Sequence, residues 1–258
     1  ADAWRRRLAQ ALEALLAPVP LDEAEAQARR LLLETLDDFA RDAAEAGALS
    51  AALVQRAAEL KLPIVEDNPY GDLWFDTAPP PSLSARNPEG SVYLGSFSKI
   101  LAPGLRLGYL VAPPALYPKL LQAKQAADLH TPSFNQRLVV EVLKDGFIER
   151  HVPTIRALYK QQCEAMLAAL DREMAGLDFQ FNRPAGGMFL WARLPEGVDA
   201  VGLLPKAVDQ GVAFVPGAAF YADHGDPRTL RLSFVTASVD QINTGVAALA
   251  QAIRGYRT

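Results

Sequence analysis

The chain has 258 residues, half of them apolar, and carries a net charge of −4 from 26 basic and 30 acidic side chains. This length and composition suit one large globular domain or two small ones with a sizeable core. The charge pattern offers no basic surface for nucleic acid, and no apolar run approaches the roughly 20 residues that cross a bilayer. The first residues lack the pattern of a signal peptide, so we expect a cytoplasmic protein without membrane or nucleic-acid partners.

Cysteine and histidine give no sign of a disulfide or a metal site. The single Cys163 has no partner for an internal bridge, and we interpret it as a buried structural thiol. The three histidines are scattered, and none has a second ligand at metal-binding spacing: His130, His151 and His224.

The first part of the chain is expected to be helical. Residues 1–46 favour an amphipathic helical hairpin rich in Ala and Leu, broken at Pro18 and Pro20, with six basic and ten acidic residues. Ser50 is a good N-cap for a further helix over 51–60.

From residue 62 onward, short apolar runs alternate with helical segments. Three runs are typical of strands buried in a parallel sheet: 62–67, 91–95 and 107–112. Helices then dominate from residue 115 to about 174, and the last of them begins near Phe147. The remaining sequence predicts four strands and two helices: strands at 177–181, 187–194, 212–215 and 230–234, and helices at 200–210 and 239–256.

Chemistry-bearing side chains follow two of the expected strands. In an open α/β sheet, ligands bind beyond the carboxyl ends of the strands, where Asp67 and Lys99 are expected. The stretch Asp67-Asn-Pro-Tyr70 is a stiff turn, because proline fixes its own backbone and restricts the residue before it. Taken alone, each of these residues is more simply a turn or surface residue, whereas the combination is what a pyridoxal phosphate site requires.

Each residue type has a chemical reason to be in such a site. Lys99 supplies the primary amine that forms a Schiff base with the cofactor aldehyde. Asp67 can hold a proton on the pyridine nitrogen, and Tyr70 can donate to the ring oxygen beside the imine. The donors suited to a phosphate are Ser96, Ser98 and Arg106. Arg231 can form a bidentate pair with the α-carboxylate of a substrate.

Six ordered motifs resemble the fold-type I class I/II aminotransferases, in the branch of the aminoadipate and multisubstrate enzymes and of the C-terminal domain of MocR-type regulators. They are Val65-Glu-Asp-Asn-Pro-Tyr, Ser96-Phe-Ser-Lys, Pro103-Gly-Leu-Arg-Leu-Gly-Tyr, Pro184-Ala-Gly-Gly-Met-Phe, Val215-Pro-Gly-Ala-Ala-Phe and Leu230-Arg-Leu-Ser-Phe. The resemblance covers about Gly47 to the C-terminus. It implies the same roles for the seven residues named above, with amino acids and 2-oxo acids as substrates and a homodimer as the assembly.

The resemblance also shows where this sequence departs from the family. In place of the family's Asn-Pro-x-Gly motif, whose Asn contacts the ring hydroxyl, stands Ala44-Glu-Ala-Gly. The family's phosphate-cradling loop and ring-stacking aromatic have no counterpart in residues 1–46. The expected fold is therefore α/β: a remnant of the large-domain sheet over 47–150 and a small C-terminal domain over 151–258, preceded by the helical segment 1–46.

Three functions remain open at this point. The first is a PLP-dependent aminotransferase acting on an α-amino acid and a 2-oxo acid through Lys99. The second is a non-catalytic module that keeps only part of the cofactor site, which the missing phosphate loop favours. The third is a lyase or decarboxylase on the same scaffold.

Overall fold

In the computed structural model, the described residues are 43–221 and 225–256, and their contacts divide them into two compact units. The described part of the first unit comprises 43–66, 80–93 and 112–115, and that of the second comprises 67–79, 94–111, 116–221 and 225–256. The helical hairpin expected in 1–46 lies almost entirely outside the described residues. All seven candidate site residues belong to the second unit.

The first unit contains helices α3 (Ala43–Glu59) and α4 (Leu83–Arg86). Ser50 lies inside α3, so the prediction that it caps a helix is wrong. The Ala-rich sequence on both sides of Ser50 has a high helix propensity and carries the helix through it. The cap of α4 is Ser82, whose hydroxyl accepts from the Ala85 N–H.

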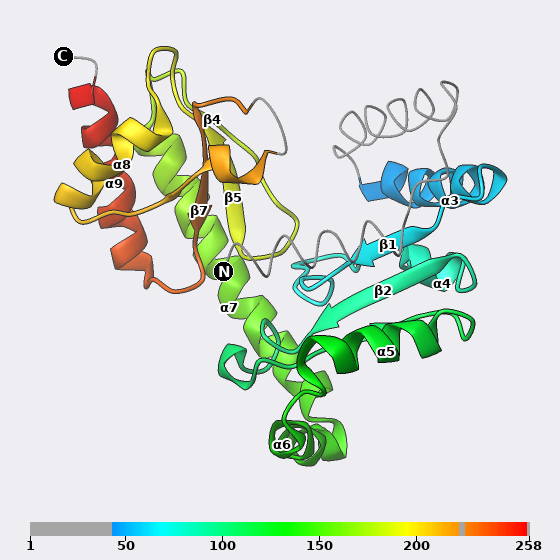
Figure 1. The fold of residues 1–258 in the computed structure, drawn as a ribbon. Helices are drawn as coiled ribbons and strands as arrows, with labels where there is room; N and C mark the ends of the chain where they lie inside the picture. Colours follow the sequence, from blue (N-terminus) through cyan, green and yellow to red (C-terminus); the bar gives the residue numbers. More distant parts are fainter. Residues whose placement is uncertain (1–42, 222–224, 257–258) are drawn as a thin grey trace. The chain divides into compact units, whose positions relative to one another are not determined.

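One sheet contains β1 (Ile64–Asp67), β2 (Ser91–Ser96) and β3 (Gly108–Val111), in the order β1-β2-β3, and Figure 1 shows β1 beside β2. All four residues of β3 are exposed, so the prediction of a third buried strand is wrong in that respect. The Ile64 N–H donates to Gly90 and the Asn68 N–H to Leu94. Because both bonds advance by four residues in the same direction, β1 and β2 run parallel. Their carboxyl ends therefore lie at the same edge of the sheet.

Three helices of the second unit confirm the expected helical region: α5 (Tyr117–Asp128), α6 (Ser133–Leu143) and α7 (Phe147–Glu173). Two short 3₁₀ helices, η1 (Pro103–Leu105) and η2 (Lys144–Gly146), lie in the connections. Over the described residues, no helix is both long enough and apolar enough to cross a membrane.

The C-terminal part folds as an antiparallel sheet covered by helices. Its strands are β4 (Gln180–Phe181), β5 (Phe189–Arg193), β7 (Thr229–Ser233) and β6 (Val215–Pro216), in that order across the sheet. Helices α8 (Ala200–Asp209) and α9 (Val239–Tyr256) agree with the sequence, and η3 (Gly217–Phe220) follows β6. The strand expected at 212–215 is wrong in position, because Gly211 takes a φ of 83° and the Val212 N–H turns back to the Ala207 carbonyl.

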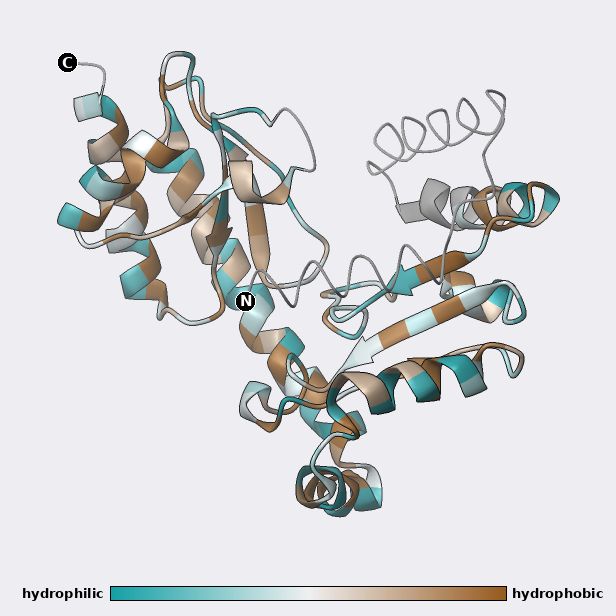
Figure 2. Ribbon diagram, in the orientation of Figure 1, coloured by the Kyte–Doolittle hydropathy of each residue, from teal (hydrophilic) through white to brown (hydrophobic). Residues whose placement is uncertain are grey.

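The helices beside this second sheet carry both hydrophobic and hydrophilic residues (Figure 2), and the two faces of the sheet have different surroundings. Leu190 and Ala192 of β5 and Leu230 and Leu232 of β7 are buried in one core with α7, α8 and α9. Because side chains alternate along a strand, Phe189, Trp191 and Arg231 lie on the opposite face. The mixed α/β fold with two sheets agrees with the expected fold class.

Candidate active site

Asp67 and Ser96 lie where the two parallel strands end. Asp67 is the last residue of β1 and is exposed, and Ser96 is the last residue of β2 and is half-buried. The Asn68 N–H donates to the Leu94 carbonyl at 3.1 Å, which ties the residue after β1 to β2. The predicted placement of Asp67 at a sheet edge is therefore what the backbone shows.

Lys99 sits in the turn that follows β2. The Ser98 N–H donates to the Ser96 Oγ at 3.1 Å, which groups both serines in this turn, and the Leu101 N–H returns to the Phe97 carbonyl. Lys99 is half-buried, with its Nζ 5.9 Å from the centroid of the Tyr70 ring. Within the described residues, Lys99 makes no ion pair or side-chain hydrogen bond, so its amine is available to a ligand.

Arg106 approaches the same turn from η1. The Phe97 N–H donates to the Leu107 carbonyl at 3.1 Å. Leu107, which follows Arg106, therefore lies beside Phe97, which stands between the two serines. Arg106 has a left-handed backbone (φ 49°, ψ 42°), which is uncommon for a residue with a side chain. Its exposed guanidinium donates to the Pro103 carbonyl at 3.2 Å, so it folds onto its own turn.

The segment after Tyr70 is attached to a second turn. The Phe75 N–H donates to Ala185, and the Gly187 N–H donates to Leu73. A Cβ placed on Gly186 would come within 2.6 Å of the Leu73 carbonyl oxygen, so only glycine fits there without a shift. Gly186 therefore serves close backbone approach, and Gly187, at φ 83°, serves a turn.

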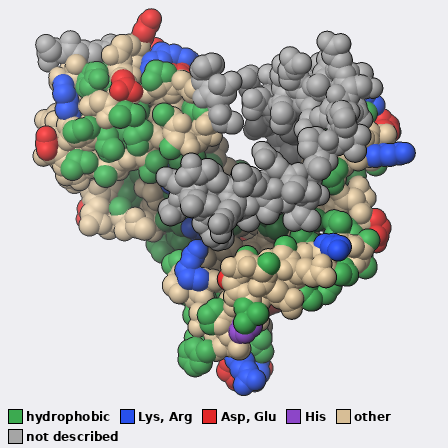
Figure 3. Space-filling view, in the orientation of Figure 1, with side chains coloured by type: hydrophobic (Ala, Val, Ile, Leu, Met, Phe, Trp, Pro, Cys, Tyr) green, Lys and Arg blue, Asp and Glu red, His purple; other side chains and the backbone are tan. Residues whose placement is uncertain are grey.

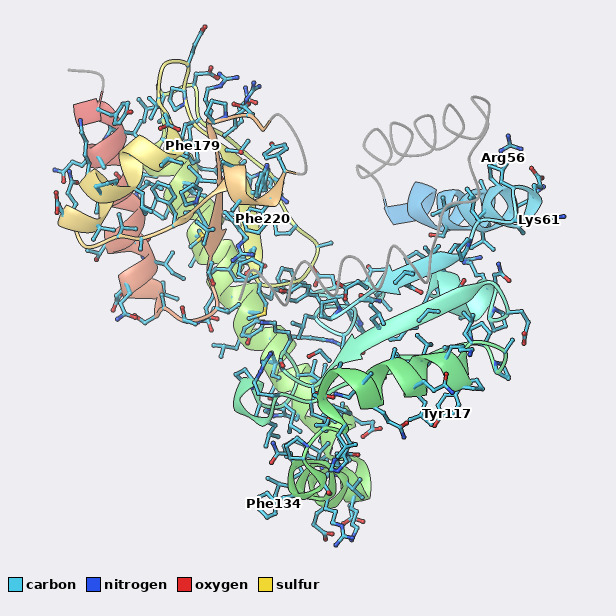
Figure 4. All side chains as sticks on the ribbon, in the orientation of Figure 1. Arg56, Lys61, Tyr117, Phe134, Phe179 and Phe220 are labelled. Atoms are coloured by element: carbon cyan, nitrogen blue, oxygen red, sulfur yellow. The ribbon has the colours of Figure 1, made fainter. Side chains whose placement is uncertain are left out.

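Aromatic rings surround Arg231. Its guanidinium carbon lies 4.0 Å from the centroid of Phe189 and 4.8 Å from that of Phe220. Figure 4 labels Phe220 on η3, close to β5. Arg231 is half-buried, and among the described residues it makes no ion pair or side-chain hydrogen bond. Its N–H donors are therefore available to an anion.

The structure joins the two cations through a pair of rings. Tyr70 meets Phe189 edge-on, with the centroids 6.0 Å apart and the planes at 84°. Lys99, Tyr70, Phe189 and Arg231 thus form one continuous series of contacts inside the second unit. Ser96, Ser98 and Arg106 are linked to it through the Lys99 turn, whereas the Asp67 side chain makes no described contact with the other six candidates.

The family comparison agrees with this geometry. The model of the family described as "Aminotransferase class I and II" matches residues 49–249. The chain belongs to the class I and II aminotransferase family.

Members of this family with known names are similar over most of the chain. A 2-aminoadipate transaminase from Thermus thermophilus is 48% identical over 79% of this chain and 52% of its own length, and aromatic-amino-acid aminotransferase 1 from Thermococcus litoralis is 43% identical over 78% and 48%. An α-aminoadipate aminotransferase from Thermus thermophilus, solved with N-(5'-phosphopyridoxyl)-L-leucine, superposes with a TM-score of 0.77 at 45% identity, over 81% of this chain and 54% of that one. The chain therefore spans about half the length of these relatives.

Pyridoxal phosphate is the cofactor of class I and II aminotransferases, and the donor set of this chain fits it. The Lys99 amine is half-buried, has no acceptor among residues 43–221 and 225–256, and lies near the Tyr70 phenol. Two hydroxyls, of Ser96 and Ser98, share its turn. The departure at Ala44-Glu-Ala-Gly47 falls within α3. The described residues group no three His, Cys, Asp or Glu side chains that could hold a metal ion.

Sequence reasoning missed the aromatic residues of the site. Phe189 and Phe220 stand in two of the quoted motifs, yet nothing in residue type alone assigned them a role. The alternation in Phe189-Leu-Trp-Ala-Arg193 was the available signal, since it places Phe189 and Trp191 on one face of a strand.

Proposed function

We propose that this chain carries the lysine-bearing part of a PLP-dependent aminotransferase, which moves an amino group between an α-amino acid and a 2-oxo acid. One observation carries the proposal: Lys99 and Arg231, two half-buried cations without polar partners among the described residues, are joined by the rings of Tyr70 and Phe189. The bound cofactor would supply an electron sink for the substrate Cα.

The chain's own residues divide the work of holding that cofactor. Lys99 would bind it covalently through Nζ and, once free, carry a proton to and from the substrate Cα. Asp67 would keep the ring nitrogen protonated, and Tyr70 would donate to the ring oxygen. Ser96 and Ser98, which share one turn, would donate to the phosphate.

Two arginines would hold anions. Arg106 joins the phosphate set once its guanidinium leaves the Pro103 carbonyl, a neutral acceptor on an exposed side chain. Arg231 would take the substrate α-carboxylate, since its planar fork matches a carboxylate and no described acid competes for it. The two curated relatives are named for 2-aminoadipate and aromatic amino acids, and these are the first substrates to try.

The proposal extends to domain organisation, assembly and location. We retain 47–150 and 151–258 as the cofactor-binding and C-terminal domains. The family resemblance favours a homodimer, and exposed apolar side chains on α5 and α6 support it. A cytoplasmic location suits a chain whose one cysteine, Cys163, is a free buried thiol.

A non-catalytic binding module is the second candidate. It is favoured by the replacement of the family's Asn by the Ala44-Glu-Ala-Gly47 sequence and by the exposure of Asp67. This candidate keeps the attachment of the cofactor to Lys99 but not its reaction with amino acids.

Visible absorption separates the two candidates. We expect added pyridoxal phosphate to give the chain a band that Lys99→Ala abolishes and Lys119→Ala keeps, since Lys119 is an exposed lysine near Gln122. Bleaching by L-2-aminoadipate or L-phenylalanine and recovery with 2-oxoglutarate support the aminotransferase. A Lys99-dependent band unchanged by amino acids supports the module, and a band equal in the Lys99→Ala variant contradicts both.

A further inference from the structure

Phe189 contacts both ends of the proposed site. Its ring supports the Arg231 guanidinium at 4.0 Å and meets Tyr70 edge-on at 6.0 Å. Phe220 contacts Arg231 at 4.8 Å and Trp191 edge-on at 5.6 Å, but no contact joins it to Tyr70. Of the described rings, Phe189 is therefore the one that joins Arg231 to Tyr70.

The backbone under Phe189 is held on both sides. β5 pairs with β7 over five residue pairs, from Phe189 with Ser233 to Arg193 with Thr229. The next side chain, Leu190, is fully buried in the helical core. Because a ladder and a core fix this strand, a force on the Phe189 ring is not relieved by movement of its backbone.

The contacts of Arg231 determine which ligand its guanidinium can bind. Aromatic rings attract a guanidinium without occupying its N–H hydrogen bonds. With no described carboxylate or carbonyl accepting from Arg231, those donors are left for a planar anion that approaches in the guanidinium plane. A carboxylate bound there would reposition the guanidinium against Phe189.

We infer that Phe189 is a positioning residue shared by the two ends of the site. Binding of a carboxylate to Arg231 then changes the environment of the Tyr70 ring, which lies beside Lys99. The inference rests on the proposed role of Arg231 and goes beyond it. Phe189 sets the guanidinium in place with one contact and adjusts Tyr70 with the other, whereas Phe220 serves Arg231 alone.

Fluorine NMR tests this coupling without the cofactor. The full chain is labelled with 3-fluorotyrosine, the Tyr70 signal is assigned with Tyr70→Phe, and 3-phenylpropanoate is the carboxylate probe. We expect the probe to shift the Tyr70 signal in the unmodified chain and not in Arg231→Gln. Phe189→Leu should abolish the shift and weaken probe binding about fivefold, the size expected for loss of a partly desolvated cation–π contact.

Phe220→Leu is the matched control, because it removes a ring from Arg231 and leaves the Tyr70 contact intact. It should weaken probe binding to a similar extent but keep the Tyr70 shift at saturation. Phe189→Met, which fills more of the same volume, replaces Phe189→Leu if thermal unfolding shows that the leucine variant does not fold.

Three results would overturn the inference: no binding of the probe to the unmodified chain, binding without a Tyr70 shift, or an equal shift in a folded Phe189 variant. The measurement contains no pyridoxal phosphate. Its failure is therefore distinct from a failure of the Lys99 absorption experiment, and either can succeed alone.

Discussion

Lys99 and Arg231 differ in their surroundings from cations that have only a structural role in the second unit. Lys160 pairs with Asp76, and Arg193 pairs with Asp226 at 2.6 Å. Lys99 and Arg231 instead face aromatic rings, and no side chain or carbonyl in the described part of the chain uses their hydrogen-bonding capacity. At the residue scale, this unused capacity on half-buried cations distinguishes a candidate ligand group from a surface charge.

Cys163 gives a prediction about pH. Burial raises the pKa of this thiol to about 11, so it stays protonated and unreactive at neutral pH. Between the ordinary thiol pKa near 9 and this value, the unfolded chain loses the proton first, so stability falls as pH rises through this window. Urea unfolding at pH 8 and pH 10.5 should show a larger loss for the natural chain than for Cys163→Ala.

The rate of alkylation is a second test of the burial of Cys163. Iodoacetamide should modify Cys163 slowly in the folded chain at pH 8 and rapidly in urea. Rapid modification of the folded chain would show that the thiol is not buried as described.

Gly186 gives a prediction about stability. An alanine Cβ there would meet the Leu73 oxygen at 2.6 Å and the Trp74 Cα at 2.7 Å, both backbone atoms that cannot rotate away. We expect Gly186→Ala to lower the free energy of unfolding by about 1–3 kcal/mol.

The matched control is Gly245→Ala, in the middle of α9, where the added Cβ would meet the Val212 side chain at an ordinary contact distance of 3.7 Å. It should raise stability by about 0.5–1 kcal/mol, as alanine does inside a helix. Equal effects of the two substitutions in urea unfolding would contradict the close approach at Gly186.

At the element scale, α7 holds the segment that presents Tyr70. The Arg156 Nε donates to the Asp72 carbonyl at 2.6 Å, and its guanidinium stacks 3.6 Å from the Trp74 ring centroid. Trp74 also bridges to Gly186 in the turn before β5. Through Arg156 and Trp74, helix α7 is therefore connected to the segment after Tyr70 and to the turn at Gly186.

Removing Arg156 should release this segment. We expect Arg156→Ala to lower the free energy of unfolding by about 1–2 kcal/mol through loss of the hydrogen bond and the cation–π stack. Trp74 fluorescence should change, and Arg156→Lys should recover only part of the stability, because an ammonium cannot stack as a flat group. A fluorescence spectrum identical to that of the natural chain would show that the stack is not formed.

The sequence predicts the elements better than their contacts. Periodicity located α7, α8 and α9, because each of them buries an apolar stripe. The helical sequence of α5 and α6 was also recognised, although α5 has no buried residue and α6 buries only Val139.

The sequence pattern misplaced the start of α3 at Ser50, since a good cap residue also tolerates a helix interior when alanines flank it. It misplaced β6, although Gly211 just after the expected helix is a local signal for a helix end. The bond from the Val212 N–H to the Ala207 carbonyl completes that end, and β6 begins only at Val215.

The same distinction holds for the site. Lys99, Asp67 and the serines follow strand ends, which short-range patterns predict. The role of Phe189 depends on contacts to residues about 40 and 120 positions away, Arg231 and Tyr70. Such long-range contacts follow only from the folded chain.

At the scale of the whole molecule, exposed apolar side chains on α5 and α6 favour self-association. Phe134 is 75% exposed and Tyr117 58% exposed, and Figure 4 labels both on these helices. Figure 3 shows hydrophobic side chains at the molecular surface in this view. Large contiguous apolar patches are uncommon on monomers and often mark an interface between proteins, which is why we propose this surface for the homodimer.

Sedimentation tests the proposed homodimer. We expect the natural chain to sediment as a dimer and Phe134→Glu to shift it toward monomer. Phe220→Glu, an exposed aromatic on η3, is the control and should leave the dimer unchanged. A natural chain that is monomeric at high concentration would contradict the assembly.

Chemical fixation of the cofactor on the chain tests most directly whether Lys99 is the lysine that binds pyridoxal phosphate. Pyridoxal phosphate is added, the complex is reduced with borohydride, and the modified lysine is located by peptide mass spectrometry. We expect one dominant modified residue, Lys99, with little modification of exposed lysines such as Lys119 and Lys144. Modification spread evenly over the exposed lysines, with Lys99 no more labelled than they are, would contradict it.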